Sequence, residues 1–202
     1  MHLACDKFWE FVSKRFPSYF SGDILEFGSY NINGTIRDHF KNGCKNYVGI
    51  DWRDGPCVDI VGLAHKVKFN YKVDAVFSAS MLEHDPYWEK SLENMINHLN
   101  PGGILVLSWG SAKNAVHCLP EAPDGKFHSL KVQKIIDFLE DKKFFIQTSV
   151  YDGDLVEMLN DYTITFEPQA KGYGEHNLIA FNVGYDETIK RGFMSDLLDE
   201  DK

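Results

Sequence analysis

The chain lacks the cysteine patterns that mark disulfide-rich and zinc-binding proteins. Its four cysteines are Cys5, Cys44, Cys57 and Cys118, and they form no C-x-x-C pair and no cysteine–histidine cluster with zinc spacing. We interpret them as reduced thiols of a cytoplasmic protein, and we find no metal constellation. No apolar run is long enough to span a membrane, so we expect no membrane-spanning segment. The first twenty residues are charged and contain no signal-peptide core, so we expect no signal peptide.

Positive charge is also scarce. The 202 residues include 21 Lys and Arg against 30 Asp and Glu, a net charge of -9. Binding to a nucleic-acid backbone needs clustered Lys and Arg, so we do not expect nucleic acid as a partner, and a small-molecule or protein-bound substrate fits better. The hydrophobic content of 44% is that of an ordinary globular protein with one full-sized core. The oligomeric state stays open.

Residues 24–34 carry the clearest local pattern. The apolar run 24–27 predicts a short buried strand, and Gly28 allows a sharp turn to which a ligand can come close. Asn33 can cap a helix that begins at Gly34 or Thr35 and ends near Gly43. A strand, turn and helix of this kind at the front of an α/β chain typically form a small-molecule site.

Two phosphate-binding motifs are missing from this turn. A dinucleotide site needs a second glycine where this chain has Tyr30, and a P-loop needs a lysine after its last glycine, where Thr35 follows Gly34. Glu26, at the end of the strand, would repel a phosphate and attract a cation. An ammonium or sulfonium group therefore suits this site better than a phosphate.

The segment Glu26-x-Gly28 followed by Asn33-Gly34 resembles the first motif of class I S-adenosylmethionine-dependent methyltransferases, although only two of the family's glycines are present. Further segments agree with the family in order: Asp51 at the end of a second strand, residues 79–86 after a fourth strand, the turn at 99–103, and a last strand after an insertion. The resemblance covers about residues 20–184.

This resemblance implies an α/β fold: a three-layer α/β/α sandwich around a Rossmann-like, mostly parallel seven-stranded sheet whose last strand is antiparallel. We expect one domain at 1–184, with an N-terminal helix at 1–20, and an acidic tail at 185–202. Periodicity predicts strands at 24–27, 47–51, 57–62, 73–78, 104–109, 144–150 and 178–183, and helices at 86–99, 129–139 and, within the insertion 152–177, around 155–159. Residues 110–128 read as a long functional loop.

The resemblance also implies S-adenosyl-L-methionine as the cofactor and S-adenosyl-L-homocysteine as its product. A carboxylate at Asp51 can accept both ribose hydroxyls, and Glu26 suits the methionine ammonium. Family members often carry an acid near position 63, where this chain has Leu63, so Ala64 or His65 would take over that adenine contact. The cofactor-binding residues that we predict are Glu26, Gly28, Ser29, Asn33, Gly34, Asp51, Trp52, Ala64, His65, Ser80, Met81 and Leu82.

Catalysis would depend mainly on position, because the methyl donor is already activated. A base is needed only if the acceptor carries a poorly acidic proton. His117, His84 and His176 are the candidates, since imidazole titrates near neutral pH, and Glu83 and Tyr30 are weaker ones. His117 lies in the 110–128 loop. A structural role, with the histidine hydrogen-bonded within its own loop, is as plausible as a role facing the substrate.

The leading hypothesis is therefore a methyltransferase that acts on an unidentified acceptor, preferably a small molecule, whose reacting atom is oxygen, nitrogen, carbon or sulfur. One alternative is an inactive methyltransferase-like partner subunit. Another is a nucleic-acid base amino-methyltransferase, because residues 85–88 resemble its Asp-Pro-Pro-Tyr motif with one proline missing. A nicotinamide-dependent oxidoreductase is a third, and Tyr30 in place of a glycine argues against it.

Overall fold

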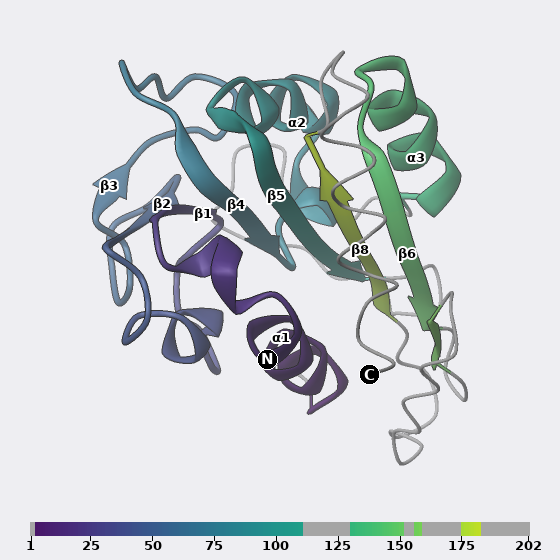
Figure 1. Cartoon of the computed structure of the whole chain (residues 1–202). Coiled ribbons are helices and arrows are strands. Elements are labelled where there is room, and N and C mark those ends of the chain that lie inside the picture. Colours follow the sequence, from purple (N-terminus) through teal and green to yellow (C-terminus); the bar gives the residue numbers. More distant parts are fainter. Residues whose placement is uncertain (1–2, 111–129, 152–155, 159–174, 183–202) are drawn as a thin grey trace.

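The computed structural model describes residues 3–110, 130–151, 156–158 and 175–182, which form one sheet with helices on both faces (Figure 1). The strands are β1 (Asp23–Phe27), β2 (Asn46–Asp51), β3 (Ile60–Val61), β4 (Val73–Ala79), β5 (Leu99–Gly110), β6 (Phe145–Tyr151), β7 (Val156–Met158) and β8 (Glu175–Phe181). The α-helices are α1 (Leu3–Arg15), α2 (Trp88–Asn97) and α3 (Val132–Asp141), and the 3-10 helices are η1 (Pro17–Phe20), η2 (Ile36–His39) and η3 (Leu82–His84).

Within the described residues, the sheet has the strand order β3-β2-β1-β4-β5-β8-β6-β7. Strands β1 to β5 pair in parallel, and β8 lies antiparallel between β5 and β6, which confirms the predicted antiparallel last strand. The chain leaves β1 toward β2 and β3, then returns to place β4 on the other side of β1. In such sheets, ligands bind where this reversal occurs, at the carboxyl ends of the strands.

The strand residues alternate between two hydrophobic cores, which confirms the predicted three layers. Ile24 and Phe77 face one side, where α1, η1 and η2 cover the sheet, while Leu25 and Val76 face α2 and α3 on the other side. On the first side, the rings of Phe40 and Phe77 lie 4.6 Å apart between centroids. Burial on both faces explains why these strands read as continuous apolar runs.

The helix predicted from Gly34 to Gly43 is wrong, because only the four-residue 3-10 helix η2 forms there. Gly34 has a φ of 136°, and Thr35 is extended at φ -135° and ψ 139°, so neither can be a first helical residue. The side chain of Asn31, rather than that of Asn33, accepts the backbone N–H of Gly34 at 2.8 Å. The chain therefore approaches η2 through a turn.

Other boundaries also differ from the predictions. The described sheet has eight strands instead of seven, since β7 replaces the short helix predicted around 155–159. The third strand is limited to β3, because the chain turns at Cys57 with a φ of 70°. Helix α1 ends before Pro17, and η1 continues the predicted segment to Phe20. Helix α2 begins at Trp88, two residues after the predicted Pro86.

Several predictions fall on residues outside the described part of the chain. These are the loop after Gly110 with His117, the helix cap at Ser129, most of the insertion 152–177, and the tail 185–202. Within the described residues, Cys5, Cys44 and Cys57 are not joined by disulfide bonds. None of the helices in the described part has both the length and the apolar character that crossing a membrane requires.

Candidate functional site

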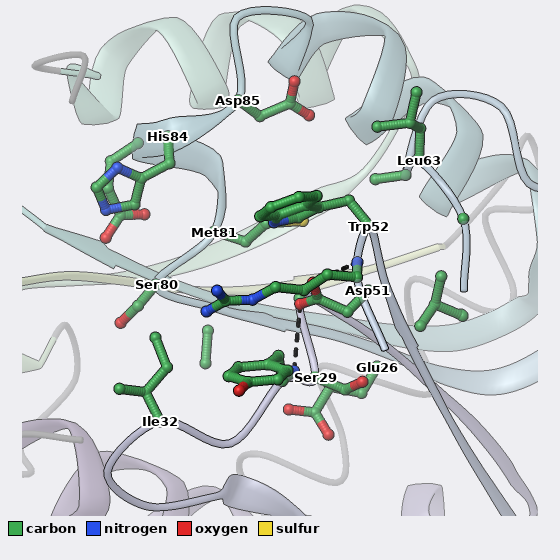
Figure 2. A pocket seen from close by; sticks show the side chains of 18 of the residues that line it. Glu26, Ser29, Ile32, Asp51, Trp52, Leu63, Ser80, Met81, His84 and Asp85 are labelled. Carbon is green, nitrogen blue, oxygen red and sulfur yellow. Dashed lines mark hydrogen bonds between the residues drawn. The ribbon is translucent and has the colours of Figure 1, made fainter. Parts of the chain in front are cut away.

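A cavity of about 800 Å³ opens at the carboxyl edge of the sheet, where the strand order reverses. Its walls come from the ends of β1, β2, β3 and β4 and the segments that follow them (Figure 2). Gly110 at the end of β5 and Cys5 from the first turn of α1 also line it. Elements that are distant in sequence thus meet at the edge where parallel α/β sheets bind small ligands.

The turn after β1 requires a glycine. Gly28 has a φ of 83°, and a Cβ at this position would lie 2.6 Å from the Cβ of Met81. The backbone N–H groups of Gly28 and Ser29 both donate to the carbonyl oxygen of Ile50, at 2.8 and 3.1 Å. The turn is therefore fixed to β2 on one side and lies against Met81, with its backbone at the cavity.

Asp51 ends β2 and is only 8% exposed. Its Oδ2 accepts the backbone N–H of Tyr30 and its Oδ1 accepts that of Arg53, each at 3.2 Å (Figure 2). Burial raises the pKa of Asp51, while the backbone hydrogen bonds from Arg53 and Tyr30 oppose that rise. The carboxylate is thus held in a fixed orientation on the cavity wall, where it can accept further hydrogen bonds.

Beside Asp51, three side chains form a stacked group. The guanidinium of Arg53 lies 3.9 Å from the centroid of the Tyr30 ring and 5.3 Å from that of Trp52. A Cβ at Gly55 would lie 2.1 Å from the Tyr30 ring, so Gly55 closes against the same ring. Tyr30, which argued against a dinucleotide site, is therefore packed as part of the wall.

Glu26 lines the cavity from β1 and is 3% exposed. The hydroxyl of Tyr47 donates a hydrogen bond to its Oε2 at 2.8 Å. Burial raises the pKa of Glu26 to about 7, against the hydrogen bond from Tyr47 and the positive charge of Arg37, which lower it. The pKa of the Glu26 carboxyl group thus lies near neutral pH.

The segment after β4 supplies the opposite wall. Ser80 has a φ of 52°, a conformation rare outside glycine, and its N–H donates to the carbonyl oxygen of Ser108 at 2.9 Å. Met81, Glu83 and His84 also line the cavity. Glu83 is 3% exposed, and its Oε1 accepts the N–H of Gly110 at 2.9 Å, which joins the ends of β4 and β5.

The structure brings nearly all the predicted cofactor residues to this one cavity. All of them line it except Leu82, whose side chain is fully buried in the core beside α2. Of the predicted bases, His84 lines the cavity, and His117 lies outside the described residues. His176 on β8 is not among the lining residues, and its ring lies 5.4 Å from that of Trp109.

Sequence reasoning missed Cys5, Arg53 and Tyr47. Cys5 reaches the cavity only because α1 packs across the sheet, and no local pattern indicates that contact. Only a weak indication in the sequence pointed to Arg53 at the site, namely its position two residues after Asp51 at the end of a strand. The indication for Tyr47 was stronger, because side chains alternate along β2 and Tyr47 therefore lies on the same face of the sheet as Asp51.

The likeness to known proteins agrees with this geometry. Residues 31–107 match the family model of the methyltransferase domain. No curated protein is significantly similar to the chain in sequence.

Solved structures are similar in fold. A S-adenosylmethionine-dependent methyltransferase from Clostridium acetobutylicum has a TM-score of 0.63 at 12% identity, over 89% of this chain and 92% of that one. A Burkholderia thailandensis 1,6-didemethyltoxoflavin-N1-methyltransferase, solved with 1,6-didemethyltoxoflavin and S-adenosylhomocysteine, has a TM-score of 0.62 at 12% identity, over 90% of this chain and 79% of that one. A S-adenosylmethionine-dependent methyltransferase from Mesorhizobium loti has a TM-score of 0.55 at 13% identity, over 83% and 97%.

At these identities the structures establish a shared fold, and the family model covers the segment that contains β2, β4 and most of β5. Together with the glycine turn after β1, these findings agree with the first motif and with the mostly parallel sheet and antiparallel last strand that the resemblance implied. The chain therefore has the fold of the S-adenosylmethionine-dependent methyltransferases to which it is similar, and its residues 31–107 match the methyltransferase domain.

Proposed function

We propose that this protein transfers a methyl group from S-adenosyl-L-methionine to a small-molecule acceptor. The observation that carries the proposal is the meeting of two buried carboxyl groups, Glu26 and Asp51, at one cavity on either side of the Gly28 turn. An amino acid joined to a nucleoside offers an ammonium group and two ribose hydroxyls, which are donors that such carboxylates accept.

The lining residues fit the parts of this cofactor. Asp51 would accept the ribose hydroxyls, and Glu26 the ammonium, with the backbone of Gly28 and Ser29 close to the methionine chain. Trp52 and Met81 offer apolar surface for the adenine, next to the segment of Ala64 and His65. The buried carboxyl groups of the lining are Glu26, Asp51 and Glu83. Its lysines are exposed, and the half-buried guanidinium of Arg53 lies against the Tyr30 ring, so the buried charge of the lining favours a cation.

The cofactor supplies a sulfonium methyl group that an acceptor can take directly, leaving S-adenosyl-L-homocysteine. The protein would then hold donor and acceptor in line and exclude water. His84 is the base that we propose for an acceptor that must lose a proton, because it lines the cavity beside Ser80 and Glu83. Glu83, fixed by Gly110, would orient a hydrogen-bond donor of the acceptor.

A small-molecule acceptor is supported by the depth of the site and by the charge of the chain. A cavity of about 800 Å³ lies within the usual size range of small-ligand sites. The alternative of a base amino-methyltransferase is disfavoured, because Asp85 is engaged at the start of α2: its carboxylate accepts the N–H of Tyr87 at 2.8 Å and the hydroxyl of Ser91. We also propose that residues 1–184 form one domain.

Calorimetric titration with S-adenosylhomocysteine, S-adenosylmethionine and NADH tests the proposal. We expect the first two ligands to bind and NADH not to bind. Asp51→Ala should lose cofactor binding with the fold intact, whereas Asp54→Ala should not, because Asp54 is exposed and outside the lining. Binding of NADH alone, or equal affinities in wild type and Asp51→Ala, would overturn the proposal. Transfer of a labelled methyl group to a pool of acceptors then separates an active enzyme from an inactive binding subunit.

A further inference from the structure

The carboxyl group of Glu26 depends on a side chain from the neighbouring strand. In the pairing of β1 with β2, Glu26 lies opposite Gly49, and Tyr47 lies opposite Ile24, one step away on the same face. From there the Tyr47 hydroxyl crosses to Glu26 and donates to its Oε2 at 2.8 Å. Tyr47 itself does not line the cavity, so it acts on this site only through Glu26.

Charged groups on η2, on β2 and before β3 act on this pair. Arg37 of η2 donates to the carbonyl oxygen of Tyr47 at 3.0 Å, and its guanidinium lies 5.0 Å from the Tyr47 ring centroid. Asp51 on β2 and Asp59 before β3 oppose the ionised form of Glu26, while Arg37 favours it. From α1, the titratable group at the cavity is the buried thiol of Cys5.

We propose that Tyr47 is a positioning residue of the cofactor site, and that the Tyr47–Glu26 pair couples binding of the cofactor ammonium group to the release of one proton. This inference rests on the proposed function, since it needs a ligand with an ammonium group at Glu26. The Tyr47 hydroxyl fixes one carboxylate oxygen and leaves the group facing the cavity. An ammonium group there favours the ionised carboxylate, so the proton must leave as the ligand binds.

The direction of the pH dependence follows from this coupling. With a pKa of about 7 before binding, Glu26 is mostly protonated at pH 5.5, and the Kd of S-adenosylhomocysteine should be about 15-fold weaker there than at pH 7.0. Tyr47→Phe removes a donor that favours the charged form, which should move the midpoint upward by about one pH unit. The loss of affinity in this variant should therefore be about tenfold at pH 5.5 and less than twofold at pH 8.5.

Calorimetry with S-adenosylhomocysteine on the whole chain measures both effects. In two buffers of different ionisation enthalpy, wild type at pH 6.0 should release about 0.9 proton per ligand bound. Tyr71→Phe is the matched control, because Tyr71 is 44% exposed and outside the cavity, and its pH profile should equal that of wild type. His65 and His84 also line the cavity, but Tyr47→Phe removes the hydrogen bond to Glu26, so a midpoint that moves in this variant belongs to Glu26.

The outcomes separate this inference from the function. Tight binding of S-adenosylhomocysteine with no proton release, or with the same Kd at pH 5.5 and 7.0, overturns the coupling and leaves the methyltransferase proposal standing. If Tyr47→Phe loses the same affinity for S-adenosylhomocysteine at all pH values, Tyr47 acts only as a packing residue. If Tyr47→Phe does not fold, the proton release of wild type still decides the coupling. No binding at any pH overturns the function and the inference together.

Discussion

Burial of Glu26 has a cost in stability that the substitution Glu26→Gln should remove. The carboxyl group is 3% exposed, and its pKa rises from 4.5 to about 7 chiefly through burial. Glutamine has nearly the same shape, stays neutral and still accepts the hydrogen bond of Tyr47, so the substitution isolates the charge.

The sign follows from the raised pKa. The folded chain binds the proton of Glu26 more tightly than the unfolded chain, so the stability from this group is fully present below pH 4.5 and is lost as the pH rises toward 7. Between pH 5.5 and pH 8, wild type should therefore lose about 2 kcal/mol that Glu26→Gln keeps, given a pKa of about 7 in the folded chain. The variant should be the more stable protein at pH 8.

Urea unfolding of both proteins at pH 5.5 and pH 8 measures this difference. Glu10→Gln is the control, because its partners Lys7 and Lys14 lower the pKa of Glu10 to about 2, far below both conditions. Its stability difference from wild type should be the same at the two pH values. A Glu26→Gln difference that is equally independent of pH would refute the reasoning. In the converse test, S-adenosylhomocysteine at 100 times Kd should stabilise wild type by about 2.7 kcal/mol and Glu26→Gln much less.

Three further substitutions separate the turn, the core and the chemistry. Gly28→Ala should lower the free energy of unfolding by about 1–3 kcal/mol, because the φ of Gly28 is positive and the new Cβ would clash with Met81. Calorimetry should show at least tenfold weaker cofactor binding in this variant. Leu82→Ala should cost about 2–5 kcal/mol in urea unfolding with cofactor affinity retained, since Leu82 is buried in the core; a large loss of affinity would contradict that placement. His84→Gln should reduce methyl transfer about 10²–10⁴-fold to whichever acceptor a labelled-methyl screen identifies, with unchanged S-adenosylhomocysteine affinity, and an undiminished rate would remove His84 as the base.

The sheet could be predicted because its signals are local. Strands β1, β2 and β4 are short, mostly apolar segments, and Gly28 after β1 and Asp51 at the end of β2 mark one edge of the sheet. Strand order came from the family resemblance, since periodicity alone does not tell which strands are neighbours. The segment around 155–159 was assigned to a helix, although a five-residue apolar run does not distinguish helix from strand.

The parts of the site that were missed depend on backbone geometry and on contacts across strands. The positive φ of Gly34 is incompatible with the helix predicted to begin there. In the 3-10 helix η3, the side chain of Leu82 lies in the core, while Glu83 and His84 line the cavity. Tyr47 reaches Glu26 across the pairing of β1 with β2, from its position opposite Ile24. Such dependence on a neighbouring strand has no signature in either strand alone.

The structure of the complex with S-adenosylhomocysteine tests the account most directly. We expect the ribose hydroxyl oxygens within about 2.7–3.2 Å of the Asp51 carboxylate, and the ammonium nitrogen at a similar distance from Glu26. A ligand whose ribose lies away from Asp51, or a cavity that stays empty at saturating ligand, would contradict the account.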